Sequence, residues 1–172
     1  MDLSALVPDF AAKIAELLRN CATRGFELVP YFTLRDPHVQ ARLWRQSRGG
    51  AEIDQEIARL VALGAPWLAG VLRSAPHSTG PWATNAAPGN SWHQWGEAVD
   101  CYWKGVDGSI VWRDGPGYAC LATEAAKLGL TSGRSFHTPD IDHVQLRSQG
   151  APSDIFAWPD IDARTKVKFG GT

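Results

Sequence analysis

Apolar residues recur at helical spacing in four parts of the chain. Between residues 8 and 24, Phe10, Ile14, Leu17 and Cys21 fall on one face of a helix, and polar side chains occupy the other faces. The predicted helices are residues 8–24, a segment opened by Asp36 and Pro37, residues 51–74 with a break at 64–66, and residues 117–130. Each has one face suited to a core.

Shorter apolar runs have the length of strands, in which successive side chains would point to opposite faces. These runs are residues 27–35, where Pro30 indicates an edge or a bulge, then 98–103, 110–112, and a run that begins at His143. Turn residues at 104–109 predict a hairpin between the second and third runs. The pattern predicts an α+β fold, with helices packed on one antiparallel β-sheet.

Length and composition indicate one small domain over residues 1–172. A chain of 172 residues with 44% hydrophobic and 20% charged residues can bury a core without disulfides. We expect the core of this domain at about residues 8–148, a helical insertion at about 51–74, and a C-terminal extension at about 149–172. The basic end of the extension, residues 164–172, is expected to be a solvated tail.

The charge balance narrows the possible partners. A net charge of -1 gives no general basic field, so we expect neither nucleic acid nor membrane as a partner, and we expect a monomer. The first eight residues lack the basic and apolar regions of a secretory signal, which leads us to expect synthesis in a cytosol. Cys21, Cys101 and Cys120 are too scattered for a zinc knuckle.

Two stretches, residues 90–100 and 139–146, each place a histidine beside carboxylates. Two imidazoles and one carboxylate make a three-ligand zinc site that leaves a fourth position for water, which is a catalytic composition. His93 and Asp100 are seven residues apart, with Gly96 between them to turn the chain into a strand. On that strand Asp100 would face a cleft, and His143 would come from a second strand.

These stretches contain paired motifs that resemble a known family. The first is Ser91-x-His93-x-x-Gly96-x-Ala98-x-Asp100, and the second, much later, is Asp140-x-x-His143. Together they resemble the zinc peptidases of the D-alanyl-D-alanine carboxypeptidase and L-alanyl-D-glutamate endopeptidase group. Upstream, Thr33-Leu34-Arg35, Gln40 and Gln46-x-Arg48-Gly49 are similar to the substrate-side segment of that group.

The resemblance implies a hedgehog or D,D-peptidase type of fold with one Zn²⁺ ion in the cleft of the sheet. It implies that His93, Asp100 and His143 are the zinc ligands. It also implies that Asp140 is the catalytic base and that Arg35 contacts the substrate or the oxyanion.

Several roles stay open on the sequence alone. In an uninterrupted strand, Asp140 would lie on the face opposite His143, so it can reach a metal-bound water only if the chain bends between Pro139 and Ile141. Three roles of His137 stay open: a competing metal ligand, a contact to the substrate or to a ligand, or no role in the site. Gln40 is a similar contact or a surface residue, and Ser91 is expected to support the site through a hydrogen bond.

The expected function is that of a phage-type endolysin, a zinc-dependent peptidoglycan hydrolase that cuts the L-alanyl-D-glutamate bond of stem peptides. Such an enzyme is made in the host cytoplasm and acts on the cell wall after release. The alternatives are a D-alanyl-D-alanine carboxypeptidase or dipeptidase of the same group, or an inactive zinc-containing binding module.

Overall fold

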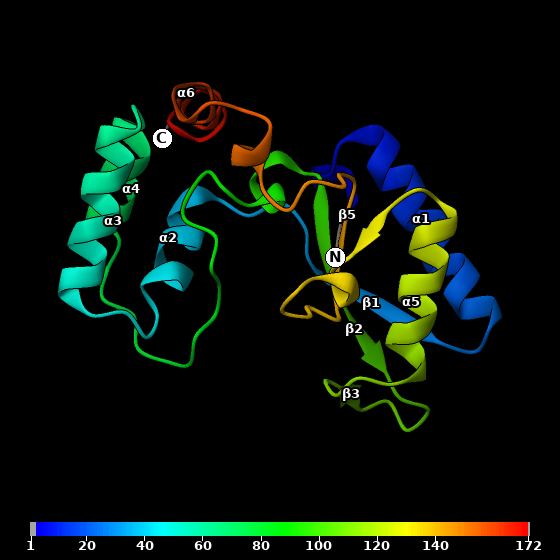
Figure 1. The fold of residues 1–172 in the computed structure, drawn as a ribbon. Helices are drawn as coiled ribbons and strands as arrows, with labels where there is room; N and C mark the ends of the chain where they lie inside the picture. The colour runs from blue at the N-terminus through cyan, green and yellow to red at the C-terminus, as the bar shows by residue number, and fades with distance from the viewer. Residues whose placement is uncertain (1–2, 172) are drawn as a thin grey trace. The chain divides into compact units, whose positions relative to one another are not determined.

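Antiparallel strands in the order β1–β2–β5–β4 form the sheet of this protein, and β3 also pairs with β2 (Figure 1). The computed structural model describes residues 3–171. The strands are β1 (Glu27–Phe32), β2 (Ala98–Lys104), β3 (Ile110–Val111), β4 (Thr131–Ser132) and β5 (His143–Gln145). The expected α+β class, with helices on one antiparallel sheet, is confirmed.

The chain divides into two compact units. One unit, here called the sheet unit, comprises residues 1–34 and 95–148, and the other, the helical unit, comprises residues 35–94 and 149–172. The sheet unit contains α1 (Pro8–Thr23) and α5 (Pro116–Lys127), together with short 3-10 helices η1 (Leu3–Ala5) and η3 (Gly133–Ser135). The boundaries predicted for the insertion and the extension stay a prediction.

Helices α1 and α5 cover one face of the sheet. The apolar stripe of α1 is buried there, with Phe10, Ile14 and Leu17 fully inaccessible to solvent. Val99 and Cys101 of β2 point into the same core, so the strand period leaves Asp100 and Tyr102 on the opposite face. Burial of the core face therefore fixes the register that presents Asp100 on the free face of the sheet.

Strand β1 contains the irregularity that Pro30 predicted. Pro30 pairs with Cys101 and Phe32 pairs with Asp100, so one extra residue, Tyr31, sits between these two pairs. A bulge of this kind redirects side chains at a sheet edge.

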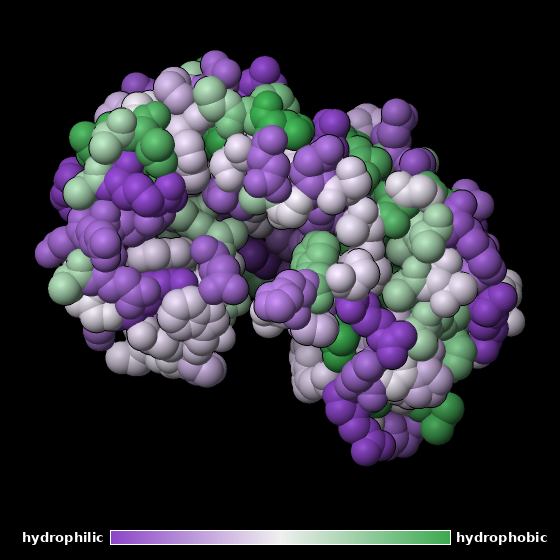
Figure 2. Space-filling view, in the orientation of Figure 1, coloured by the Kyte–Doolittle hydropathy of each residue, from purple (hydrophilic) through white to green (hydrophobic). Residues whose placement is uncertain are grey.

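The helical unit contains α2 (Pro37–Arg45), α3 (Gly50–Ala62), α4 (Pro66–Ser74) and α6 (Trp158–Phe169), with the 3-10 helices η2 (Trp92–Trp95) at its boundary and η4 (Pro152–Asp154). The predicted cap of α2 is present, since the backbone N–H of His38 donates to Asp36 Oδ1 at 2.6 Å. The predicted break before Pro66 separates α3 from α4. Ile53, Ile57 and Leu60 of α3 are buried, as expected for an amphipathic helix, and Figure 2 shows both hydrophilic and hydrophobic residues on the visible surface of the protein.

Of the segment expected to be a solvated tail, residues 164–171 are mostly exposed, but residues 164–169 are helical rather than a free tail. Residues 164–169 belong to α6, whose Ile161, Asp162 and Thr165 are buried. Asp162 explains this placement, because its carboxylate accepts the backbone N–H groups of Leu68 at 2.8 Å and Trp67 at 3.4 Å. It thereby caps the first turn of α4, whose own N-cap residue is an alanine. None of the helices within residues 3–171 has the length and apolar character needed to cross a membrane.

Candidate metal centre

Asp100 and His143 are direct neighbours across two strands. They form a cross-strand pair of the antiparallel ladder between β2 and β5, so both side chains project from the same face of the sheet. Asp100 Oδ1 lies 2.9 Å from His143 Nδ1, and both side chains are about nine-tenths buried. A carboxylate and an imidazole are thus held together in a largely desolvated place.

The pKa of His143 shows that its surroundings favour a positive charge. Burial alone would lower the pKa of His143, but the hydrogen bond to Asp100 and the charges of Asp100 and Asp140 outweigh it, and the pKa is raised. The ring is also oriented by Gln145, whose Oε1 lies 3.1 Å from Nε2. The surrounding carboxylates therefore stabilise a positive charge at this position, which is a condition for cation binding.

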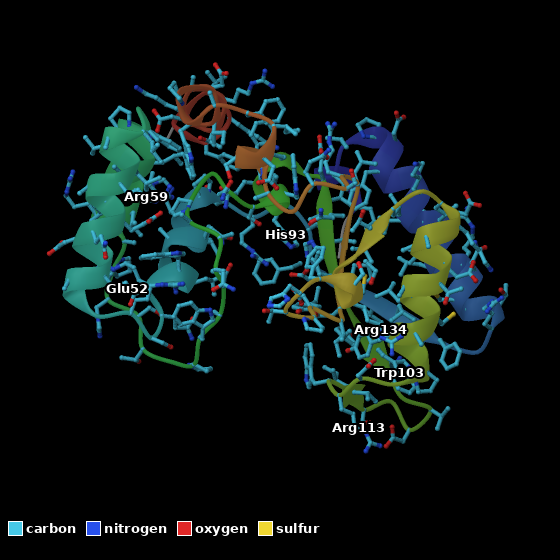
Figure 3. All side chains as sticks on the ribbon, viewed as in Figure 1. Glu52, Arg59, His93, Trp103, Arg113 and Arg134 are labelled. Carbon is cyan, nitrogen blue, oxygen red and sulfur yellow. The ribbon has the colours of Figure 1, made fainter. Side chains whose placement is uncertain are left out.

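His93 completes the group from η2. One ligand atom each from His93, Asp100 and His143 lie within 4.8 Å of one another, and all three residues are buried (Figure 3 labels His93). The carbonyl of His93 accepts the backbone N–H of Arg35 at 3.1 Å, and the carbonyl of Ser91 accepts that of Gln94 at 3.0 Å, so backbone bonds hold the short helix. Two imidazoles and one carboxylate at this spacing fit a Zn²⁺ ion that keeps an open position.

Gly96 turns the chain from η2 into β2. Its φ of +74° lies in the left-handed region, and an added Cβ would stand 3.0 Å from the carbonyl oxygen of Ala5. A larger residue would be strained there and would press against the backbone of residues 5–7. The glycine predicted as the turn between His93 and Asp100 therefore has a definite structural reason.

Asp140 begins the turn that directly precedes β5. β5 begins only at His143, and the backbone N–H of His143 donates to the Asp140 carbonyl at 3.3 Å, which closes a turn. Desolvation of the carboxyl and a hydrogen bond with Asp142 raise the pKa of Asp140 to about 7, although the residue as a whole is exposed. A carboxyl that exchanges its proton near neutrality, close to the charges of Asp100 and His143, suits a general base.

Arg35 and Gln40 form a buried polar network in the helical unit. Arg35 Nη1 donates to Gln40 Oε1 at 3.1 Å. The amide nitrogen of Gln40 donates to Thr84 Oγ1 at 3.2 Å and to the carbonyl of Ala86 at 2.7 Å. Gln40 is fully buried, so it orients Arg35 and holds the 84–86 loop rather than lying on the surface.

Arg48 belongs to the segment that is similar to the substrate side of the family. In this structure its side chain holds other residues of the protein in place. Its guanidinium lies 4.0 Å from the ring centroid of Trp44 and 3.8 Å from that of Trp82. It donates to the carbonyl of Thr84 at 3.0 Å and to Glu52 at 3.0 Å. Cation–π contacts and hydrogen bonds together fasten the loop that precedes η2.

The remaining predicted residues have varied surroundings. Ser91 is half-buried and opens η2 through its carbonyl, whereas His137 is exposed in the loop before β5. Within residues 3–171, the group that could hold a metal contains His93, Asp100 and His143, and His137 is outside it. The roles predicted for Ser91 and His137 stay predictions.

Tyr31 is a residue near the centre that sequence reasoning missed. Its hydroxyl donates to Asp142 Oδ2, and burial together with Asp142 and the charge of Asp100 raises its pKa. Asp142 in turn is hydrogen-bonded to Asp140. The apolar run of residues 27–35 gave no sign of the face on which Tyr31 lies, and its partner is visible only once β1, β2 and β5 are placed side by side.

A family model independently matches most of the chain. The model described as VanY, D-alanyl-D-alanine carboxypeptidase, matches residues 4–133. The chain belongs to this family. Peptidases of the VanY family are zinc-dependent and act on peptidoglycan, and the group formed by His93, Asp100 and His143 could bind the metal.

The family model and the structure account for different members of the metal-binding group. The matched residues include Arg35, His93 and Asp100 but end before Asp140 and His143. The structure supplies the second histidine through the pairing of β5 with β2. The comparison with curated proteins returned no match.

Proposed function

We propose that this protein is a zinc-dependent endopeptidase that cuts the L-alanyl-D-glutamate bond of peptidoglycan stem peptides. The proposed zinc dependence is supported by the buried group of His93, Asp100 and His143, whose ligand atoms lie within 4.8 Å of one another. The choice of bond is a proposal that rests on the resemblance of the two histidine motifs to a group that includes L-alanyl-D-glutamate endopeptidases.

Bound zinc would supply a water molecule whose acidity approaches neutral pH and would polarise the scissile carbonyl. Asp140 accepts the proton of that water and later delivers it to the leaving amine, a task that suits its raised pKa. Arg35, held by Gln40, donates hydrogen bonds to the oxygen that becomes negative. The reaction requires no covalent intermediate with the enzyme.

The second candidate is a D-alanyl-D-alanine carboxypeptidase or dipeptidase. The description of the matching family favours it. In that case Arg35 would bind the terminal carboxylate of the substrate, because a planar guanidinium pairs well with a carboxylate.

Mass spectrometry of digested peptidoglycan separates the two candidates. Products with a new amino-terminal glutamate support the endopeptidase, whereas release of terminal D-alanine alone contradicts it and supports the carboxypeptidase. Chelation should abolish either activity and added Zn²⁺ should restore it. An Asp140→Asn variant should keep its zinc and lose hydrolysis, which separates the base from the ligands.

The proposal includes a place of action. The enzyme is made in the bacterial host cytoplasm and reaches the cell wall after release, as an endolysin does. Expression of the protein alone should leave host cells intact, and added purified protein should lyse cells whose outer barrier has been permeabilised. Lack of lysis by active protein would contradict this role.

A further inference from the structure

Three aromatic side chains meet on the free face of the sheet, beside Asp100. The ring centroids of Tyr31 and Trp112 are 5.5 Å apart, those of Tyr102 and Trp112 are 6.1 Å apart, and those of Tyr31 and Tyr102 are 6.2 Å apart. We call these three residues the aromatic platform. All of them belong to the sheet unit.

The platform is open to solvent. Trp112 retains 56% of its exposure, and Tyr31 and Tyr102 are half-buried. Trp112 follows the end of β3, and its neighbour Arg113 is labelled beside that strand in Figure 3. A contiguous patch of partly exposed aromatic rings marks an interaction site more often than scattered apolar residues do, so a platform beside a metal centre is a candidate binding surface.

The platform is continuous with the metal centre. Tyr102 is two residues beyond Asp100 on β2 and faces the same side, which places the two Cα atoms about 7 Å apart. The hydroxyl of Tyr31 is hydrogen-bonded to Asp142, the residue before His143. A substrate held at the metal would therefore extend directly onto these rings.

We propose that the aromatic platform binds a saccharide ring of the peptidoglycan glycan strand. Pyranose rings present flat C–H faces that stack on aromatic rings, while their hydroxyl groups bond to phenol, indole and carboxylate groups, all of which are present here. This inference rests on the proposed function and adds a determinant of specificity to it.

The length of the substrate supports a saccharide over a peptide side chain. In peptidoglycan the L-alanine is joined through a lactyl group to the muramic acid ring. For a cut after L-alanine, the ring lies about two residue lengths, or about 7 Å, from the scissile carbonyl. For a cut between the terminal D-alanines it lies about five residue lengths away, about 17 Å. The spacing of Tyr102 from Asp100 along β2, about 7 Å, is of the order of the first distance and well short of the second.

The test compares two soluble substrates that differ only in the saccharide. One is N-acetylmuramoyl-L-alanyl-D-glutamyl-L-lysine and the other is the same peptide with an acetyl group in place of the sugar. We expect the wild-type enzyme to cleave the first with a kcat/KM about threefold to tenfold higher. Equal rates for the two substrates would overturn the proposal.

Variants of Trp112 show whether the ring itself carries the preference. Trp112→Ala and Trp112→Leu should make the two rates equal, while Trp112→Phe should keep most of the difference. Val106→Ala, at a fully exposed position in the β2–β3 turn, is the control that should change nothing. A preference that survives Trp112→Leu would overturn stacking on the Trp112 ring, because the saccharide would then be recognised elsewhere.

A binding measurement tests saccharide binding by the platform independently of the proposed endopeptidase activity. If the enzyme fails to cut between L-alanine and D-glutamate, the proposed function is wrong, and the platform is tested with the peptide-free disaccharide of N-acetylglucosamine and N-acetylmuramic acid. Shifts of an indole NMR signal that is absent in Trp112→Ala would support saccharide binding. Absence of shifts at millimolar disaccharide would overturn it.

Discussion

Replacement of Gln40 by methionine tests whether the buried network of the helical unit positions Arg35. Methionine has nearly the volume of glutamine and keeps its apolar contacts, so Gln40→Met creates no cavity. It removes the acceptor of the Arg35 hydrogen bond and both donors to the 84–86 loop. The change is therefore confined to polar interactions.

The expected cost follows from those three hydrogen bonds. Each of the two neutral bonds, to Thr84 and to Ala86, contributes about 1 kcal/mol, and the bond from the charged Arg35 contributes about 1.5–3 kcal/mol. Because Gln40 is fully buried, water cannot replace its amide without rearrangement. We expect the free energy of unfolding to fall by about 3–5 kcal/mol.

Urea denaturation monitored by circular dichroism measures this cost. Val39→Ala, one residue earlier on the exposed face of α2, serves as the control and should change stability by less than about 0.5 kcal/mol. Zinc content should stay near that of wild type, and kcat should fall because Arg35 loses its orientation. A Gln40→Met protein with wild-type kcat and a stability loss below about 1 kcal/mol would refute the network.

Three further perturbations address other parts of the structure. Asp162→Ala removes the cap that α6 gives to α4, and we expect a loss of about 2–3 kcal/mol by urea denaturation, against little change for the exposed Asp160→Ala. Gly133→Ala places a Cβ 2.5 Å from the Asp140 carbonyl oxygen, so hydrolysis should fall at least about tenfold, whereas Gly150→Ala, with room for a Cβ, should be neutral. The pKa of His143 is raised in the metal-free protein, so the stability from its ion pair with Asp100 is present below about pH 6.5 and is lost as the pH rises through the folded-state pKa. The melting temperature of metal-free protein should therefore fall from pH 6 to pH 9, while a rise over that interval would contradict the ion pair.

The helices and the free face of the sheet were predictable because both depend on periodicity. The stripe of Phe10, Ile14 and Leu17 and the alternation around Asp100 each reflect burial on one side of an element. Period-two reasoning also showed that Asp140 needs an interruption of the strand, and β5 is preceded by a turn from Asp140 to His143. The role of Asp140 as base stays a prediction.

Long-range polar contacts could not be predicted in the same way. The basic composition of residues 164–172 indicated a solvated tail, but it gave no sign that Asp162 would cap a helix 94 residues earlier in the chain. Tyr31 was missed for the same reason, because its partner Asp142 is set by the tertiary arrangement of the strands. Hydrophobic patterns specify faces, whereas the partners of buried polar groups depend on the complete fold.

The most direct measurement is the zinc content of the purified protein alongside its hydrolysis of peptidoglycan. We expect about one zinc ion per chain in the wild type. The His143→Ala and Asp100→Ala variants should lose both the ion and the activity. Undiminished hydrolysis by protein freed of transition metal, or full zinc occupancy in both variants, would contradict the assignment of His93, Asp100 and His143 as the metal centre.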